Sequence, residues 1–127
     1  PKKWISDINC LVNLLQKKYP KTPIFFTNMP PIKEFPAFPK SIQLVIGNLV
    51  ESLGKELQAF TNNREAVFYF NDIITLKKWT EKKSLGSYNA SIYFSDGVHP
   101  SELTYRIWGE EMGEFICKNY KKRSIRK

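Results

Sequence analysis

Ile24-Phe25-Phe26-Thr27-Asn28-Met29 is a short, mostly apolar stretch between two prolines, Pro23 and Pro30. A second stretch of the same kind, Ala66-Val67-Phe68-Tyr69-Phe70-Asn71, follows later in the chain. Continuous apolar runs of this length are typical of strands that are buried on both faces of a parallel sheet. The sequence therefore predicts two strands, at 24–29 and 66–71, in the interior of a sheet.

Three segments with apolar residues at helical spacing surround these strands, at 3–19, 41–60 and 102–120. We expect each predicted helix to bury one apolar face. These faces hold Trp4, Ile8, Leu11 and Leu15 in the first helix, Ile42, Val45, Leu49, Leu53, Leu57 and Phe60 in the second, and Tyr105, Trp108, Met112 and Phe115 in the third. Gly109 and Gly113 share one face of the last helix, where close packing would offset a cost of roughly 1 kcal/mol for each glycine.

The order helix, strand, helix, strand, helix predicts an α/β fold, in which helices cover both faces of a parallel sheet. No helix or strand is predicted in the polar stretch between the second strand and Tyr88. Two strands are too few for such a sheet, because a pair buried on both sides needs further strands beside it. We therefore expect residues 1–127 to be the C-terminal part of a larger single domain. An upstream part of the protein or self-association would then complete the sheet.

The positive charge of the chain is concentrated at its C-terminal end. The formal net charge is +8, but residues 118–127 carry six cations and no acid. The rest of the chain keeps 14 of the 20 cations against 12 acids, which is close to balance. A basic tail of this kind more often keeps the protein soluble or frays than it binds nucleic acid. We therefore expect no nucleic-acid partner. No apolar run approaches the roughly 20 residues that span a bilayer, so no transmembrane segment is expected either.

Ser95-Asp96-Gly97-Val98-His99-Pro100-Ser101 holds the only histidine of the chain, three residues after a carboxylate. One interpretation is a polar loop whose aspartate and serine shape a turn and cap the last helix. The other is a catalytic pair, in which Asp96 holds one imidazole nitrogen and the other nitrogen faces a nucleophile. Gly97 and Pro100 make the loop a rigid junction, which suits a catalytic group. Nearby serines are Ser84, Ser87, Ser91, Ser95 and Ser101, none of them on a recognisable nucleophile turn.

Other chemistry-bearing residues are few. The spacing of Cys10, Cys117 and His99 gives no paired zinc ligands, so no metal site is expected. Two cysteines do not determine the compartment, and any signal peptide would precede Pro1.

These elements together resemble the SGNH (GDSL-type) hydrolases, a family of serine esterases and lipases. The stretch 95–101 is similar to the family's final block, an Asp-Gly-x-His-Pro element that opens the last helix. Tyr105 and Trp108 fit the aromatic residues that usually follow it. Met29-Pro30-Pro31 and Phe35-Pro36-Ala37-Phe38-Pro39 look like the loop after a core strand in one bacterial branch. The match is to the last third to half of the family's domain.

The resemblance implies a three-layer α/β/α sandwich of the flavodoxin-like type, with a parallel sheet of about five strands. This chain would carry the last two strands and three helices. His99 would act as general base and then general acid on a small ester, and Asp96 would fix its tautomer. The family's Gly-Asp-Ser and Gly-x-Asn-Asp blocks do not occur in this sequence, so the nucleophile and the oxyanion hole are expected upstream of Pro1. No metal and no organic cofactor are implied.

Two pairs of alternatives remain open at this point. The chain is either part of a carboxyl-ester hydrolase or a non-catalytic remnant or interaction module that keeps the fold without the chemistry. Phe35 and Phe38 either line the acyl side of a substrate pocket or fill the gap between strand and helix, as loop aromatics usually do. Thr104 stands where the family often has glycine, a departure that affects helix packing and leaves the triad untouched.

Overall fold

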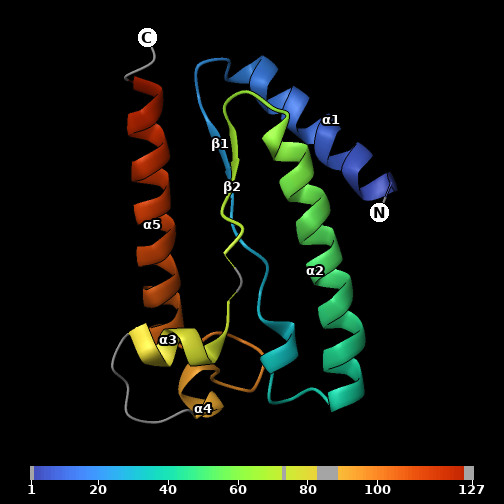
Figure 1. Ribbon diagram of the computed structural model, residues 1–127, viewed down its shortest axis with the longest axis vertical. Coiled ribbons are helices and arrows are strands. Elements are labelled where there is room, and N and C mark those ends of the chain that lie inside the picture. Colours follow the sequence, from blue (N-terminus) through green and yellow to red (C-terminus); the bar gives the residue numbers. More distant parts are fainter. Residues whose placement is uncertain (1, 73, 83–88, 125–127) are drawn as a thin grey trace.

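The computed structural model describes residues 2–72, 74–82 and 89–124. Along the chain the elements are α1 (Lys2–Lys18), β1 (Ile24–Phe26), the 3₁₀ turn η1 (Ile32–Glu34), α2 (Lys40–Asn62), β2 (Val67–Tyr69), α3 (Leu76–Lys82), α4 (Ala90–Tyr93) and α5 (Glu102–Ser124). The described part of the chain is mostly helical, with one two-stranded parallel sheet (Figure 1). The predicted mixed α/β class is therefore confirmed.

The two strands pair where the apolar stretches predicted them, but both are shorter than predicted. Ile24 lies opposite Val67, and Phe26 lies opposite Tyr69. Ala66 has a φ of 59°, in the left-handed region, so β2 begins only after it. β1 ends before Asn28, whose buried side-chain amide donates to the backbone oxygen of Asp72 at 2.8 Å. Within the described residues, the second edge of β1 has no strand beside it.

Helices lie on opposite faces of this sheet. On one face the rings of Phe25 and Phe68 stack at 4.9 Å, and Phe115 of α5 meets Phe25 edge-on at 6.2 Å. On the other face Tyr69 reaches towards α2, where its hydroxyl lies 3.0 Å from the position that a Cβ on Gly54 would take. Figure 1 shows α5 and α2 on either side of the strands, with α1 crossing at the end where α2 finishes.

The main apolar core lies beyond the ends of the strands, around two helices that the sequence did not predict. Leu76 and Trp79 of α3 are spaced by three residues and are almost fully buried. Asn89 caps α4 by accepting the backbone N–H of Ser91. α3 falls in the stretch that looked polar because so few of its residues are apolar, and α4 is a single short helix just after that stretch. The cluster consists of Phe35, Ile74, Leu76, Trp79, Tyr93, Phe94 and Ile107.

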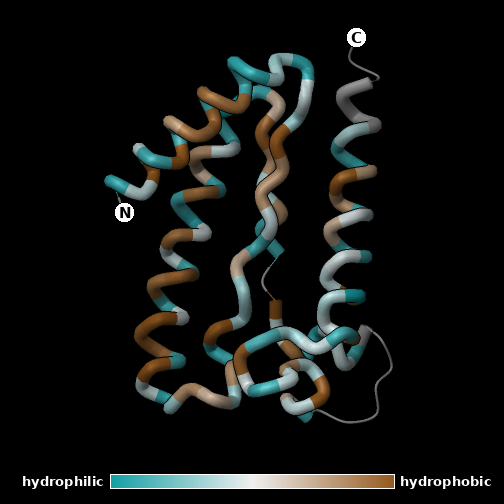
Figure 2. Tube along the Cα trace, turned by 180° about the vertical axis from the view of Figure 1, so that it is seen from behind, coloured by the Kyte–Doolittle hydropathy of each residue, from teal (hydrophilic) through white to brown (hydrophobic). Residues whose placement is uncertain are grey.

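The predicted buried face of α2 is wrong over the first half of the helix. Ile42, Val45 and Leu49 are 41%, 68% and 54% exposed, and Figure 2 shows this apolar run along the helix. The helix instead turns Gln43 inward, and its side-chain amide donates to the backbone oxygens of Phe35 and Phe38 at 2.7 and 3.1 Å. Satisfying these carbonyls sets the rotation of the helix and leaves the neighbouring apolar side uncovered.

Two expectations about α5 are also wrong. No described atom lies within 4 Å of a Cβ built on Gly109 or Gly113, so close packing does not explain these glycines. Tyr105, expected on the buried face, is 59% exposed, whereas Trp108 is half-buried and packs against the core. The helix also continues to Ser124, so most of the basic 118–127 segment is helical, while residues 125–127 lie outside the described range.

None of the described helices combines the length and the apolar character needed to cross a membrane.

The open space beside Gly109 makes it a suitable site for a stability test. Gly109→Ala adds a methyl group that meets nothing and removes the conformational freedom of glycine in the unfolded chain. We expect the free energy of unfolding to rise by about 0.5–1 kcal/mol in urea denaturation. Gly54→Ala is the matched control, because its Cβ would press on the Tyr69 hydroxyl; an equal gain from both variants would contradict this assignment.

Candidate catalytic pair at the start of the last helix

Residues 95–99 form a closed loop that joins α4 to α5. At its neck the backbone N–H of Ser95 donates to the oxygen of His99 at 2.9 Å. Phe94 and Pro100 form an isolated antiparallel bridge there, and the N–H of Ser101 donates to the oxygen of Tyr93 at 2.8 Å. These backbone contacts hold both ends of the loop, so its five residues have little freedom to move apart.

The first turn of α5 is capped as the sequence predicted. The Ser101 hydroxyl accepts the backbone N–H of Thr104 at 3.3 Å and donates to the oxygen of Ile92 at 2.7 Å. The Thr104 hydroxyl donates to the oxygen of Tyr93 at 2.7 Å and is fully buried. The Thr104 side chain therefore ties α5 to the end of α4.

The Asp96 carboxylate is the centre of the loop. One of its oxygens, Oδ1, accepts the backbone N–H groups of Val98 and His99 at 3.0 and 2.8 Å. The other, Oδ2, accepts from the ring Nδ1 of His99 at 2.6 Å. The predicted contact between the two side chains is confirmed, and the turn-shaping interpretation holds at the same time, because one carboxylate does both.

The charge of Asp96 determines which ring nitrogen of His99 carries the proton. The backbone N–H of His99, its ring N–H and the backbone N–H of Val98 lower the pKa of Asp96 to about 2. The carboxylate is therefore ionised at neutral pH and only accepts hydrogen bonds, so Nδ1 is the donor. In the neutral ring the Nε2 lone pair is then free to take a proton. The His99 side chain is 73% exposed, which leaves this nitrogen accessible.

The proline-rich loop after β1 packs against the Asp96–His99 loop. Gly97 has a φ of +86°, and a Cβ at this position would come within 2.9 Å of Ala37. The N–H of Ala37 donates to the oxygen of Gly97 at 3.2 Å. Glycine is required here both for its backbone angle and for this close approach. Sequence reasoning missed Ala37, since nothing in an alanine between two prolines marks a partner sixty residues away.

Phe35 and Phe38 lie on the core side of this loop. Phe35 is buried, and its ring packs against Phe94 and Phe38 at 5.2 and 5.5 Å. Phe38 is half-buried against the same cluster. The two rings thus fill the space between elements, which is the second of the two interpretations given for these loop aromatics. Their contact with substrate stays a prediction.

Among the described residues, none of the serines near the histidine bonds to its ring. Ser91 donates to Asn89, Ser95 to the backbone oxygen of His99, and Ser101 caps α5. Ser84 and Ser87 lie outside the described residues. For the described part of the chain, the ring of His99 has one hydrogen-bond partner, Asp96.

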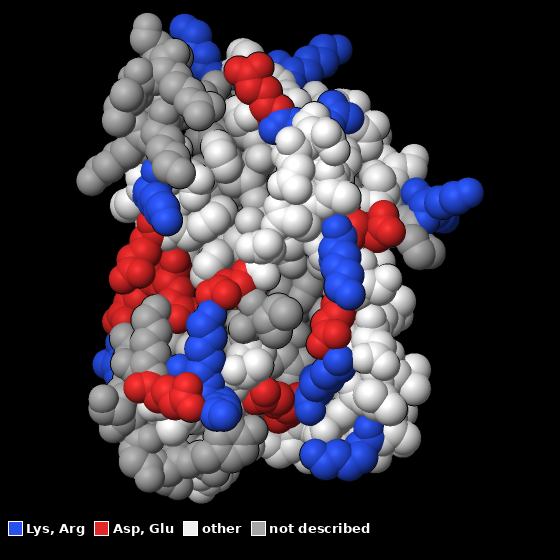
Figure 3. Space-filling view, in the orientation of Figure 1, with Lys and Arg blue, Asp and Glu red and all other residues white. Residues whose placement is uncertain are grey.

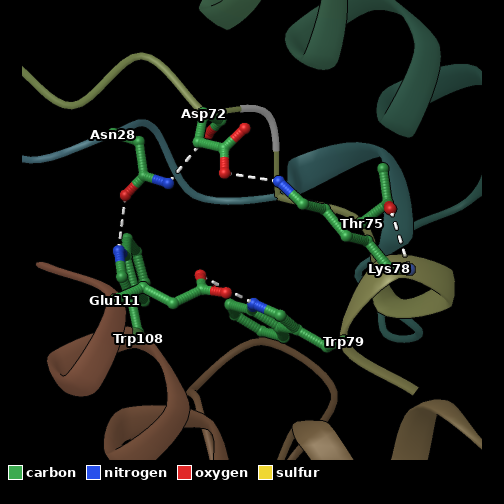
Figure 4. A network of polar contacts seen from close by, with 7 residues as sticks. All are labelled: Asn28, Asp72, Thr75, Lys78, Trp79, Trp108 and Glu111. Atoms are coloured by element: carbon green, nitrogen blue, oxygen red, sulfur yellow. Dashed lines mark hydrogen bonds and ion pairs between the residues drawn. The ribbon is translucent and has the colours of Figure 1, made fainter. Parts of the chain in front are cut away.

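A buried polar network fixes α5 against the strand ends (Figure 4). The indole N–H of Trp108 donates to Asn28, which follows β1, and Asn28 donates to the backbone of Asp72, which follows β2. The indole N–H of Trp79 in α3 donates to the buried carboxylate of Glu111 at 3.1 Å. The network positions the helix that begins beside His99. The sequence marked Trp108 as an aromatic residue on the buried face of the helix, but its partner Asn28 lies too far away in sequence to be inferred.

Among the described residues, no group of three or more His, Cys, Asp and Glu side chains is arranged to hold a metal ion. Comparison with models of protein families, with curated proteins and with solved structures finds no match to this chain.

The tautomer of the single histidine can be measured directly. We expect ring ¹⁵N shifts of neutral His99 to show the Nδ1–H form, because Asp96 only accepts hydrogen bonds. Asp96→Asn should move the ring towards the Nε2–H form, because an amide can donate to Nδ1. Asp72→Asn is the matched control, since its carboxylate pairs with Lys78. The same tautomer in all three proteins would contradict the proposed role of Asp96.

Proposed function

We propose that this chain supplies the acid–base half of a carboxyl-ester hydrolase of the SGNH type. One observation carries the proposal: His99 donates Nδ1–H to an ionised carboxylate at 2.6 Å and leaves Nε2 accessible. This arrangement suits a general base that takes a proton from a serine hydroxyl and returns it to the leaving alcohol. The resemblance of 95–101 to the family's final block supports the same assignment.

The nucleophilic serine and the oxyanion hole, on this proposal, lie on a segment that precedes Pro1. That segment would also supply the strands of a three-layer α/β/α sandwich. The unpaired edge of β1 and the positions of α2 and α5 on opposite faces of the sheet support this arrangement. The exposed ring of His99 leaves room for an approaching hydroxyl. The substrate class is a small carboxylic ester.

A non-catalytic interaction module is the second candidate. It is favoured by the exposed apolar side chains of Ile42, Val45 and Leu49, which form one stripe on α2. Contiguous exposed apolar surface of this kind marks contact sites in soluble proteins. The two candidates differ in whether a serine reacts at all, which the next experiment decides.

The first test measures serine reactivity and turnover of a short-chain p-nitrophenyl ester. The 127-residue chain should neither react with a fluorophosphonate nor hydrolyse the ester. The protein that includes the upstream segment should do both. In that protein His99→Ala should lower turnover by about 10⁴-fold or more. Asp96→Asn should lower turnover by a smaller factor if backbone oxygens also orient the ring. Glu56→Gln, an exposed change on α2, is the control. Full turnover in the His99 variant would rule out this base.

The second test measures association of the 127-residue chain. Among the described residues, one edge of β1 has no strand beside it and α2 has an uncovered apolar stripe, so sedimentation should show species larger than the monomer. Val45→Lys should weaken association if the α2 stripe takes part, and association unchanged in that variant assigns it to the β1 edge. If the 127-residue chain unfolds cooperatively as a monomer and hydrolyses esters by itself, two expectations are wrong: that further strands complete its sheet, and that the nucleophile lies outside it.

A further inference from the structure

A cavity of about 490 Å³ lies between α2 and the segment that follows β1. Its walls are largely apolar, and Met29, Pro30, Ile32, Val50 and Ile74 contribute to them. Neither Asp96 nor His99 lines it, so it is separate from the catalytic pair. It opens beside the carboxyl ends of both strands, which is the usual position of ligand sites in α/β sheets.

Two glycines of α2 keep this cavity open. Gly47 and Gly54 are seven residues apart, which is two helical turns, so both face it. The side-chain stem of Lys33 lies directly over Gly47, and its ammonium pairs with Glu51 at 2.6 Å. Any larger residue at position 47 would displace this stem. The Lys33–Glu51 pair therefore bridges η1 and α2 along one wall of the cavity.

The charges around the cavity leave one carboxylate without a cation. In the orientation of Figure 1, Figure 3 shows acidic and basic side chains alternating on the side of the molecule that α2 occupies. Glu51 pairs with Lys33, and Asp72 pairs with Lys78. The carboxylate of Glu34 has no cationic partner within the described residues, and its Oε2 accepts the N–H of Leu76 at 2.7 Å. Lys55, the remaining cation of the lining, is exposed to solvent.

The polar groups inside the cavity are hydrogen-bonding groups held at fixed positions. Burial raises the pKa of Glu34, against the opposing effect of the Leu76 N–H. Burial likewise raises the pKa of Tyr69, so its hydroxyl stays neutral. A half-buried carboxylate beside apolar walls is stabilised by a ligand that brings its own positive charge.

From this arrangement we infer that the cavity binds a small apolar molecule carrying a primary ammonium group, which pairs with Glu34 while the apolar body packs between Met29, Val50 and Ile74. The inference does not depend on the proposed esterase activity, because the residues of the two sites are different.

The test is an NMR titration of the 127-residue chain with n-hexylammonium, n-hexanol and n-hexanoate as probes. The amide signals of Gly47 and Gly54 report on the cavity, and those of Gly109 and Gly113, which face open space, serve as internal controls. We expect saturable shifts at the first pair only, with hexylammonium binding tightest and hexanoate weakest. Glu34→Gln keeps the side-chain shape and the acceptor for Leu76, and should weaken hexylammonium binding about tenfold. Glu56→Gln, outside the cavity lining, should leave it unchanged.

Several results would overturn the inference. Shifts that do not saturate, or that appear equally at all four glycines, mean that the cavity holds no ligand of this class. If hexanoate binds as tightly as hexylammonium, charge pairing with Glu34 has no role in binding. Unchanged binding of hexylammonium to a folded Glu34→Gln variant would lead to the same conclusion. If that variant does not fold, the comparison of the three probes on the unaltered chain still decides the matter.

Discussion

The parallel pairing of β1 with β2 brings the carboxyl ends of both strands to one edge of the sheet, and both candidate sites lie at that edge. Parallel strands cannot be joined by a tight turn, so the chain must cross over, and α2 is that crossover. The segments that leave the strands, beginning at Thr27 and Phe70, then lie side by side. They form the cavity with α2, the polar network with α5, and the support beneath the Asp96 loop.

Much of the fold is predictable from the sequence, because helical spacing and apolar runs are local signals. The three long helices and both strands form where the pattern placed them. α1 ends just before Pro20, α2 begins after Pro39, and α5 begins after the Ser101 cap. The rotation of α2 was not predictable. It depends on Gln43 satisfying two carbonyls of a loop whose path no local pattern specifies. A polar residue thus overrides the larger apolar face, since a buried carbonyl without a partner costs more than an exposed leucine.

The candidate site divides in the same way. Asp96 and His99 are three residues apart on a glycine turn, so their contact could be predicted from spacing alone. The groups that hold them in place come from distant segments. Ala37 reaches Gly97 from the proline-rich loop, and Asn28 reaches Trp108 from the end of β1. The cavity was missed for the same reason, since Glu34 and Gly54 come to line one cavity only after the crossover has formed.

The loop between β1 and α2 contributes residues to both sites. Its first half, from Met29 to Glu34, forms a wall of the cavity, and its second half supplies Ala37, which packs against the Asp96–His99 loop. Prolines at both ends restrict its backbone, and Gln43 and the Lys33–Glu51 pair fasten it to α2 at two points. Both fixed points lie on α2, so the two halves of the loop are held against the same helix. Because Ala37 also packs closely against Gly97, one loop positions both a wall of the cavity and the Asp96–His99 loop.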